Sequence, residues 1–551
     1  MSKLLSKLDS KIILGLIFTL ALFLRIYNLD KNPPSLNWDE VSHGYNAYSI
    51  LITGKDEWGV FLPWSNIRAY GDYPLPVYTY LTIPWIALFG LNEFAIRVTS
   101  AIFGSLLTFS TYFLSKKILK SEIFGLIGAF LMALSPWSLM LSRQVTQSIP
   151  AISLASFGLL FFLKGIGGKK RWIITGSILM GLSAYAYHNT RILVPVLFLI
   201  LIILFRKFFL QNKKILVATL IIGAVFFLPL VFVLTSKEGT ARSAWVGILD
   251  SGAINYLNDS RGKSNLPEVV AKFIYNKPVY FGFKAVSNYL GYFNPIYLGF
   301  EGGSQYQLSL PHFGLIYPVE LPFFYVGLIY LIWRFRKADN FNKFILIWLI
   351  LAPIPAAVTR DAYHVGKSST MLPVLTIVTL IGLSLTINYL KKNLTNLVTF
   401  VWLLFFLGVG ITFVIYQINY YVDYPRDYSF SWQYGYRQVV EYVNKETSHY
   451  NKVVFTKKYG EPHEYFLFYS KYNSELYRND PKLIRYEKTN WFWVDGFSKY
   501  VFMNEWEIKE KLKNETDVLL VTDPGNYPNG AKVLKRINFL NGQTAFEIVS
   551  I

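Results

Sequence analysis

The sequence of 551 residues contains no cysteine, and only 16% of its residues are charged. The absence of cysteine excludes disulfide bonds, thiolate metal sites and cysteine nucleophiles. So few charges, together with a hydrophobic content of 53%, are uncommon in soluble domains. The sequence also lacks a GxxxxGKS/T string and a strand–GxGxxG–helix unit, the motifs that bind nucleotide phosphates. Direct use of ATP or of a nucleotide-linked substrate is therefore disfavoured.

Acidic residues are scarce relative to basic ones, and the formal net charge is +20 at pH 7. Such a charge is common in proteins that bind nucleic acid. Here, however, the lysines and arginines form short clusters between long apolar stretches, which is typical of membrane-protein loops. We therefore expect contact with membrane lipid and no nucleic-acid partner.

Several apolar stretches have the length needed to cross a bilayer as helices. The chain is thus expected to be a polytopic α-helical membrane protein with about 11 transmembrane helices. The expected spans are residues 12–27, 98–115, 122–137, 148–163, 172–187, 192–205, 214–234, 315–333, 342–358, 371–390 and 395–417.

The basic clusters also orient these spans. With a cytoplasmic N-terminus, every short inner loop is basic, as the positive-inside rule requires. These loops are residues 116–120, 169–171, 206–214, 334–337 and 391–392. The first span follows Lys3, Lys7 and Lys11, but Arg25–Asp30 offers no small-residue cleavage site, so a cleaved signal peptide is not expected. The predicted location is the plasma membrane.

Two further apolar segments are expected to lie along the outer surface as interfacial helices. Residues 74–89 are short and contain three prolines, and residues 41–52 form a second candidate. If residues 74–89 crossed the bilayer, Lys116 and Lys117 would face outward, against the charge rule.

Three longer regions then face outward, namely residues 28–97, residues 235–312 and the tail. The tail is polar and aromatic, and strand-like runs at 453–456 and 518–522 alternate with helical patterns. We therefore expect a transmembrane catalytic domain over residues 1–417 and an extracytoplasmic soluble domain, α/β or α+β, over residues 418–551.

An acid pair, Asp39 and Glu40, directly follows the first span. Ionisable groups beside a membrane are costly and are often functional. The same pair would also suit the N-terminal turn of a helix over residues 41–52. A further acid, Asp72, precedes Tyr73 and Pro74, where a plain turn is an equally simple interpretation.

Most of the unusual cationic and histidine residues fall at the same outer face. Together with the acids they suit a lipid phosphate donor, since arginine and lysine would hold the phosphate while a carboxylate removes a proton from an acceptor hydroxyl. The candidates for substrate binding are Arg191, Arg360, Lys367, His188, Arg97, Arg143 and His364.

Each of these cations also has a structural interpretation. His188 and Arg191 are three residues apart at the expected end of a span, and Arg191 could simply reach the interface. Arg97 and Arg143 could mark span boundaries. Glu320, inside the eighth expected span, could be functional or could pair within the bundle. For a metal, Asp72, His188 and Glu301 are weak candidates because their spacing carries no metal-binding signature.

The order of motifs in the first half resembles one family. The Asp39–Glu40 pair is followed by Asp72–Tyr78, by Phe89–Gly90 and by the run from Ala95 to Gly104. This order is similar to the protein O-mannosyltransferase and lipid A aminoarabinose transferase group of GT-C membrane glycosyltransferases. The similarity is strong over residues 30–165 and looser over 170–390, where YAYHNTRILVP and the loop before Met371 are similar to prokaryotic members.

The resemblance implies an inverting transfer of a sugar from a polyprenyl phosphate to an acceptor on a protein, lipid or glycan. It implies that Asp39 is the catalytic base, that Glu40 completes the pair and that Asp72 shapes the site, with a divalent metal possible. The aminoarabinose transferases carry a lysine where this chain has Tyr73. Binding of the donor phosphate must then depend on other residues, and Arg191, Arg360 and Lys367 are the candidates in that order.

The main alternative is a transporter or flippase of lipid-linked sugars. Such proteins place polar residues at mid-depth in the bundle and often show paired broken helices. Here the charges gather at the outer ends of the spans. A second alternative is an O-antigen ligase or polymerase, but those proteins lack this acid-pair loop. A third is a receptor or scaffold that binds through its tail, but the tail has no clear binding motif.

Overall fold

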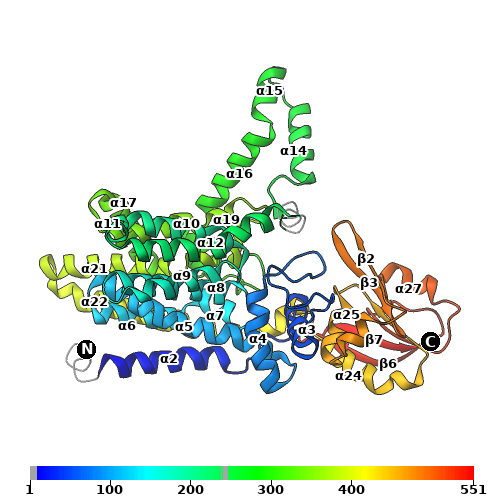
Figure 1. Ribbon diagram of the computed structural model, residues 1–551. Coiled ribbons are helices and arrows are strands. Elements are labelled where there is room, and N and C mark those ends of the chain that lie inside the picture. Colours follow the sequence, from blue (N-terminus) through cyan, green and yellow to red (C-terminus); the bar gives the residue numbers. More distant parts are fainter. Residues whose placement is uncertain (1–8, 237–238, 240–245) are drawn as a thin grey trace. The chain divides into compact units, whose positions relative to one another are not determined.

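The computed structural model describes residues 9–236, 239 and 246–551 (Figure 1). Lys3, Lys7 and part of the region 235–312 lie outside the described residues. The chain divides into two compact units, each described here by itself. Unit 1 comprises residues 1–25, 100–142 and 146–416, and unit 2 comprises residues 26–99, 143–145 and 417–551. The first loop and the tail are thus parts of one unit.

Unit 1 is built from α-helices, and three of them, α2, α5 and α22, include residues of unit 2. The helices are α2 (Ser10–Ile26), α5 (Glu93–Leu119), α6 (Glu122–Leu134), α7 (Pro136–Ser142), α8 (Ser148–Ile166), α9 (Arg171–Ser183), α10 (His188–Leu204), α11 (Arg206–Gln211), α12 (Lys213–Thr235), α14 (Ser251–Gly262), α15 (Glu268–Ile274), α16 (Lys277–Gly291), α17 (Leu321–Arg334), α18 (Asn340–Leu351), α19 (Ile354–Ala357), α20 (Val365–Ser368), α21 (Val374–Asn393) and α22 (Thr395–Ile418).

Among the described residues, 7 helices are long and apolar enough to cross a membrane, or up to 8 if the bent pair α6–α7 forms one span. This confirms a polytopic helical membrane protein, whereas the expected count of eleven stays a prediction. α9 and α10 account for part of the difference, because both are shorter than the 18 residues required.

One sequence-based placement in this unit is corrected and one is refined. The span expected to end at residue 187 ends at Ser183, because Tyr187 has an extended backbone (φ −153°, ψ 142°) that separates α9 from α10. His188 and Arg191 therefore begin a helix instead of ending one. Glu320 lies at the N-terminal edge of its candidate span, where its carboxylate accepts a hydrogen bond from the main-chain N–H of Tyr317.

Glycines allow α17 and α21 to pack backbone against backbone. A Cβ on Gly382 would lie 1.8 Å from the carbonyl oxygen of Phe323, and one on Gly327 would lie 2.1 Å from that of Val378. Small residues at such crossings are how membrane helices gain van der Waals contact where lipid supplies no hydrophobic drive. From the same unit, α14, α15 and α16 project as an arm away from the other helices (Figure 1).

Unit 2 contains a seven-stranded mixed sheet in the order β2-β3-β4-β1-β5-β7-β6. The strands are β1 (Lys452–Thr456), β2 (Ile484–Lys488), β3 (Trp491–Phe497), β4 (Tyr500–Met503), β5 (Val518–Thr522), β6 (Lys532–Asn538) and β7 (Thr544–Ser550). The helices are α3 (Trp38–Thr53), α4 (Pro76–Phe89), α23 (Tyr424–Tyr428), α24 (Tyr436–Glu446), α25 (Pro462–Tyr469), α26 (Ser474–Arg478) and α27 (Glu505–Lys511).

The centre of this sheet is its parallel part. β1 pairs in parallel with β4 and β5, and both β1 and β5 are almost wholly buried. Continuous burial is typical of parallel strands, which are covered on both faces, and it explains the unbroken apolar runs of the tail. One core cluster joins residues of α3, such as Val41 and Tyr45, to strand residues such as Phe455 and Leu519.

Candidate functional site

The acid pair lies in the first turn of α3. The side chain of Asn37 accepts a hydrogen bond from the N–H of Glu40 at 3.0 Å, and the carboxylate of Glu40 accepts one from the N–H of Asn37 at 3.2 Å. This reciprocal cap fixes the start of the helix. Consecutive helical residues point about 100° apart. Asp39 is accordingly exposed while Glu40 is fully buried.

Glu40 forms a bidentate ion pair with Arg97 of α5. The Nε and Nη2 atoms of Arg97 lie 2.9 and 2.8 Å from the two carboxylate oxygens, and both side chains are 0% exposed. The remaining guanidinium N–H groups bond the carbonyls of Leu29, Pro33 and Ser35. These contacts fasten the start of the first loop to α3.

The side chain of Tyr70 holds the Asp39 carboxylate in place. The Tyr70 hydroxyl donates to Oδ1 of Asp39 at 2.6 Å, the length of a charge-assisted bond. Burial and the adjacent Asp39 raise the pKa of Tyr70 well above its usual value, so the phenol stays protonated and remains a donor. The Tyr70 ring stacks on Trp491 of β3 with a centroid distance of 5.3 Å. Asp39 is therefore accessible to solvent but fixed in direction.

Asp72 lies in a turn beside this pair. Its Oδ1 accepts the N–H of Tyr73 at 2.8 Å, and its main-chain carbonyl accepts the N–H of Ala69 at 3.0 Å. Gly71 packs so closely on Trp491 that a Cβ there would lie 2.2 Å from the ring. Burial lowers the pKa of His43 to about 4 against the opposing charge of Asp72, so this histidine is neutral at physiological pH.

The side chain of Arg143 also makes structural contacts within unit 2. It is 2% exposed, and its guanidinium donates to the carbonyls of Tyr27 and Asn32 and to the hydroxyl of Tyr420. It also lies 5.3 Å from the Tyr420 ring centroid. The contacts of Arg97 and Arg143 favour the structural interpretation of these two arginines over a phosphate-binding one.

In unit 1 a second polar group surrounds Lys367, which is 5% exposed. Its Nζ lies 2.9 Å from Oδ2 of Asp361 and 3.2 Å from the hydroxyl of Thr359. Burial alone would raise the pKa of Asp361, but the hydrogen bond and charge of Lys367 outweigh it, and the pKa is lowered. Lys367 is thus a mostly buried lysine that is paired with a carboxylate.

The start of α10 lies against this group. The side-chain amide of Asn189 donates to the main-chain carbonyl of Lys367 at 2.7 Å, which brings the turn of His188 and Arg191 next to α20. His364 caps α20 by accepting the N–H of Lys367 at 3.2 Å. Four of the predicted donor-binding residues are therefore neighbours along these two helix starts, and Arg191 is 4% exposed.

Arg360 differs from these residues. Its side chain is 48% exposed and pairs with Asp250 at 3.1 Å. Surface pairs of this kind are weak and can be exchanged for another anion at little cost.

The predicted metal ligands are not part of any three-residue ligand cluster among the described residues. Glu301 pairs instead with His312 at 3.1 Å, and both are exposed. The cluster that the described residues do form consists of Glu57, His463 and Glu464 in unit 2. Sequence reasoning missed it, because no spacing links the first loop to the tail. It also missed Tyr70, although the proximity of Tyr70 to Asp72 in sequence was an available signal.

Comparison with known proteins agrees with the resemblance. A family described as dolichyl-phosphate-mannose-protein mannosyltransferase matches residues 72–232. Comparison with curated protein sequences gives no match.

Among solved structures, the apo oligosaccharyltransferase of Archaeoglobus fulgidus is similar with a TM-score of 0.53 and 14% identity, over 84% of this chain. The chain spans 64% of that protein's length. ArnT from Cupriavidus metallidurans, bound to undecaprenyl phosphate, matches over 98% of both chains with a TM-score of 0.44 and 12% identity. The resemblance to the mannosyltransferase group is confirmed over residues 72–232, and the chain has the fold of a GT-C membrane protein.

Proposed function

We propose that this protein is an inverting glycosyltransferase that moves a sugar from a polyprenyl phosphate to an acceptor hydroxyl at the outer face of the plasma membrane. The observation that carries the proposal is the different environment of the two acids in the pair. Glu40 is buried and paired, whereas Asp39 is exposed and oriented by Tyr70. A fixed, accessible carboxylate is what a general base requires.

In this mechanism Asp39 takes the proton of the acceptor hydroxyl as the oxygen attacks the anomeric carbon. The bond from that carbon to the phosphate oxygen breaks on the opposite face, so one displacement inverts the configuration. Glu40 has a positioning role, because it fixes the first turn of α3. Asp72 shapes the loop that carries Tyr70.

The leaving lipid phosphate gains negative charge, which fixed cations stabilise in the transition state. Lys367 and Arg191 are the favoured candidates, since both are mostly buried and electrostatic effects are stronger away from water. His188 and His364 flank them, and Arg360 is a more peripheral candidate. For comparison, the oligosaccharyltransferase AglB of Archaeoglobus fulgidus, which is similar to this chain in fold, has been solved in complex with a dolichol phosphate.

The proposal is tested by reconstituting the purified protein in lipid and supplying a panel of radiolabelled polyprenyl-phosphate sugars. Release of polyprenyl phosphate with one donor would establish the enzyme class and name the sugar. The alternative, a flippase, predicts movement of the lipid-linked sugar across the bilayer with no release of phosphate from any donor.

Tyr70→Phe is expected to lower kcat/KM about tenfold, since a hydrogen bond to a charged group is worth about 1.5–3 kcal/mol and part of it orients Asp39. The measurement is initial rate against donor concentration. Tyr48→Phe is the matched control, because the Tyr48 hydroxyl is exposed and contacts a main-chain carbonyl, that of Lys471, at 3.5 Å. Equal rates for wild type and Tyr70→Phe would remove the orienting role.

Lys367→Met is expected to lower kcat about 100-fold, as removal of one transition-state donor typically does. Steady-state kinetics separate this from a loss of donor affinity alone, which would raise KM. Lys391→Met, at the exposed end of α21, is the control and should match wild type. If Lys367→Met keeps its turnover, the buried lysine serves only its pairing with Asp361.

A further inference from the structure

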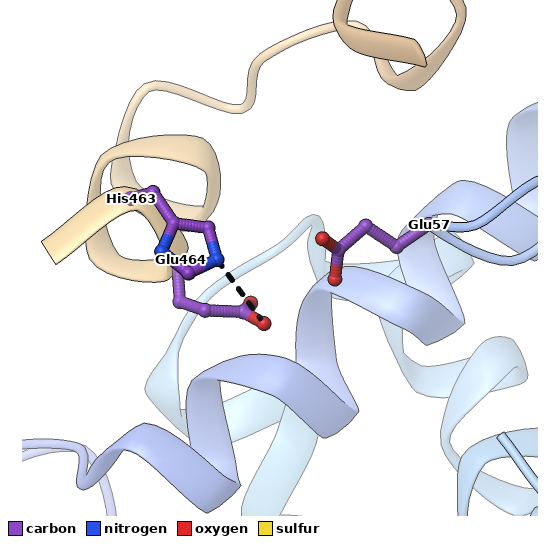
Figure 2. Close-up of side chains that lie close together, drawn as sticks. All are labelled: Glu57, His463 and Glu464. Carbon is purple, nitrogen blue, oxygen red and sulfur yellow. Dashed lines mark ion pairs between the residues drawn. The ribbon is translucent and has the colours of Figure 1, made fainter. Parts of the chain in front are cut away.

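Outside the proposed catalytic residues, unit 2 holds three buried side chains that face one another (Figure 2). Glu57, His463 and Glu464 are 1%, 3% and 1% exposed. One ligand-type atom from each lies within 4.8 Å of the others. The first comes from the turn after α3, and the other two come from the first turn of α25.

The fold fixes both ends of this cluster. The main-chain N–H of Glu57 donates to the side chain of Asn46 at 3.0 Å, and the preceding Asp56 accepts the N–H groups of Trp58 and Val60. His463 and Glu464 are adjacent on a helix whose core residues pack beneath the sheet. The three side chains are therefore held together by the surrounding structure.

Their hydrogen-bonding capacity is left incomplete. Oε2 of Glu57, Oε2 of Glu464 and Nδ1 of His463 are buried and make no hydrogen bond. Buried polar atoms in proteins nearly always have a partner, and an unsatisfied group calls for an explanation such as a bound ion. Two such carboxylate oxygens beside one imidazole indicate a shared ligand.

Nearby arginines do not supply that partner. Arg478 donates to Ser49, to Thr53 and to the main-chain carbonyl of Asp56. The guanidinium of Arg485 lies over the Trp58 ring, 3.8 Å from its centroid, and its Nη1 has no hydrogen bond. Neither arginine forms an ion pair with the carboxylate of Glu57 or Glu464.

The imidazole is also oriented for a metal. Its Nε2 lies 4.0 Å from Oε1 of Glu464, as the dashed line in Figure 2 marks. Its Nδ1 lies 3.5 Å from Oε2 of Glu461. Nε2 is therefore the nitrogen that faces the cluster, while Nδ1 is directed toward the Glu461 carboxylate, as the second nitrogen of metal-binding histidines commonly is.

We propose that Glu57, His463 and Glu464 bind a divalent transition-metal cation such as Zn²⁺, which fastens the turn after α3 to α25. One nitrogen and two carboxylate ligands suit Zn²⁺, with water or a further oxygen completing four-coordination. The role is structural, and it is independent of the proposed glycosyl transfer.

The test measures Zn²⁺ bound to the full-length protein, purified without metal affinity resin and held in lipid nanodiscs. Elemental analysis should give one Zn²⁺ per chain after dialysis. Glu57→Gln and His463→Ala should each weaken binding at least about 100-fold, since loss of even an outer-shell partner costs about 10–100-fold. Added Zn²⁺ should raise the melting temperature of wild type but not that of Glu57→Gln or His463→Ala.

His449→Ala is the matched control, because His449 forms an exposed histidine–glutamate pair with Glu446 in the same unit. It should keep wild-type Zn²⁺ binding. Bound Co²⁺ should show the visible absorption of a nitrogen–oxygen site, and His463→Ala should abolish it.

The competing explanation is a proton shared between the two carboxyl groups. It predicts no stoichiometric Zn²⁺ and a melting temperature that rises in Glu57→Gln, because the glutamine amide can donate to Glu464 without the uptake of a proton. That pair of results would overturn the proposal. Neither result depends on sugar transfer, so it stands or falls separately from the proposed function.

Discussion

Asp39→Asn is expected to reduce sugar transfer by at least about 100-fold and by up to about 10,000-fold, the range that general-base catalysis supplies. Asparagine has the same shape and can still accept the Tyr70 hydrogen bond, which is 2.6 Å long in the wild type. It cannot take a proton. The loss should therefore appear in kcat, with little change in melting temperature or in retention of the donor.

The measurement is release of polyprenyl phosphate from the reconstituted protein with its preferred donor. Asp30→Asn provides the control, since Asp30 is an exposed acid of the same loop and should leave the rate unchanged. A loss of less than about tenfold for Asp39→Asn would contradict the assignment of Asp39 as the general base. Lipid-sugar movement that survives this substitution, without any turnover, would favour a flippase.

The helical part of the fold could be predicted because its signals are local. Apolar length and clustered basic residues indicate membrane spans without knowledge of neighbours. The residues at which the helices begin and end were less predictable. Nothing in the run from Tyr185 to Arg191 reveals the extended residue at which α9 and α10 separate, so His188 and Arg191 were placed at the wrong end of a helix.

The candidate site was predictable only where its residues are close in sequence. The capping pattern from Asn37 to Glu40 is readable from sequence, and it indicates a helix start. That Arg97 would bind Glu40 bidentately was not readable, because the pairing depends on how the first loop folds back. For the same reason Trp491 and the cluster of Glu57 with His463 could not be foreseen, since tertiary packing brings the tail to the loop.

The ion pair of Glu40 and Arg97 carries the second large effect. Arg97→Met is expected to lower the free energy of unfolding by about 3–5 kcal/mol, the usual cost of breaking a buried pair. The substitution leaves the buried Glu40 carboxylate without its charge partner and frees the carbonyls of Leu29, Pro33 and Ser35. Denaturant titration of the purified protein in micelles measures the change.

Two further variants separate the pair from a general effect of losing an arginine. Arg426→Met removes exposed pairs with Asp423 and Asp427, and it should cost no more than about 1 kcal/mol. Combining Arg97→Met with Glu40→Leu should recover part of the stability, since an apolar pair removes the buried charge. Recovery should stay incomplete because the three carbonyls remain unpaired. If Arg97→Met costs as little as Arg426→Met, the first loop does not depend on this pair.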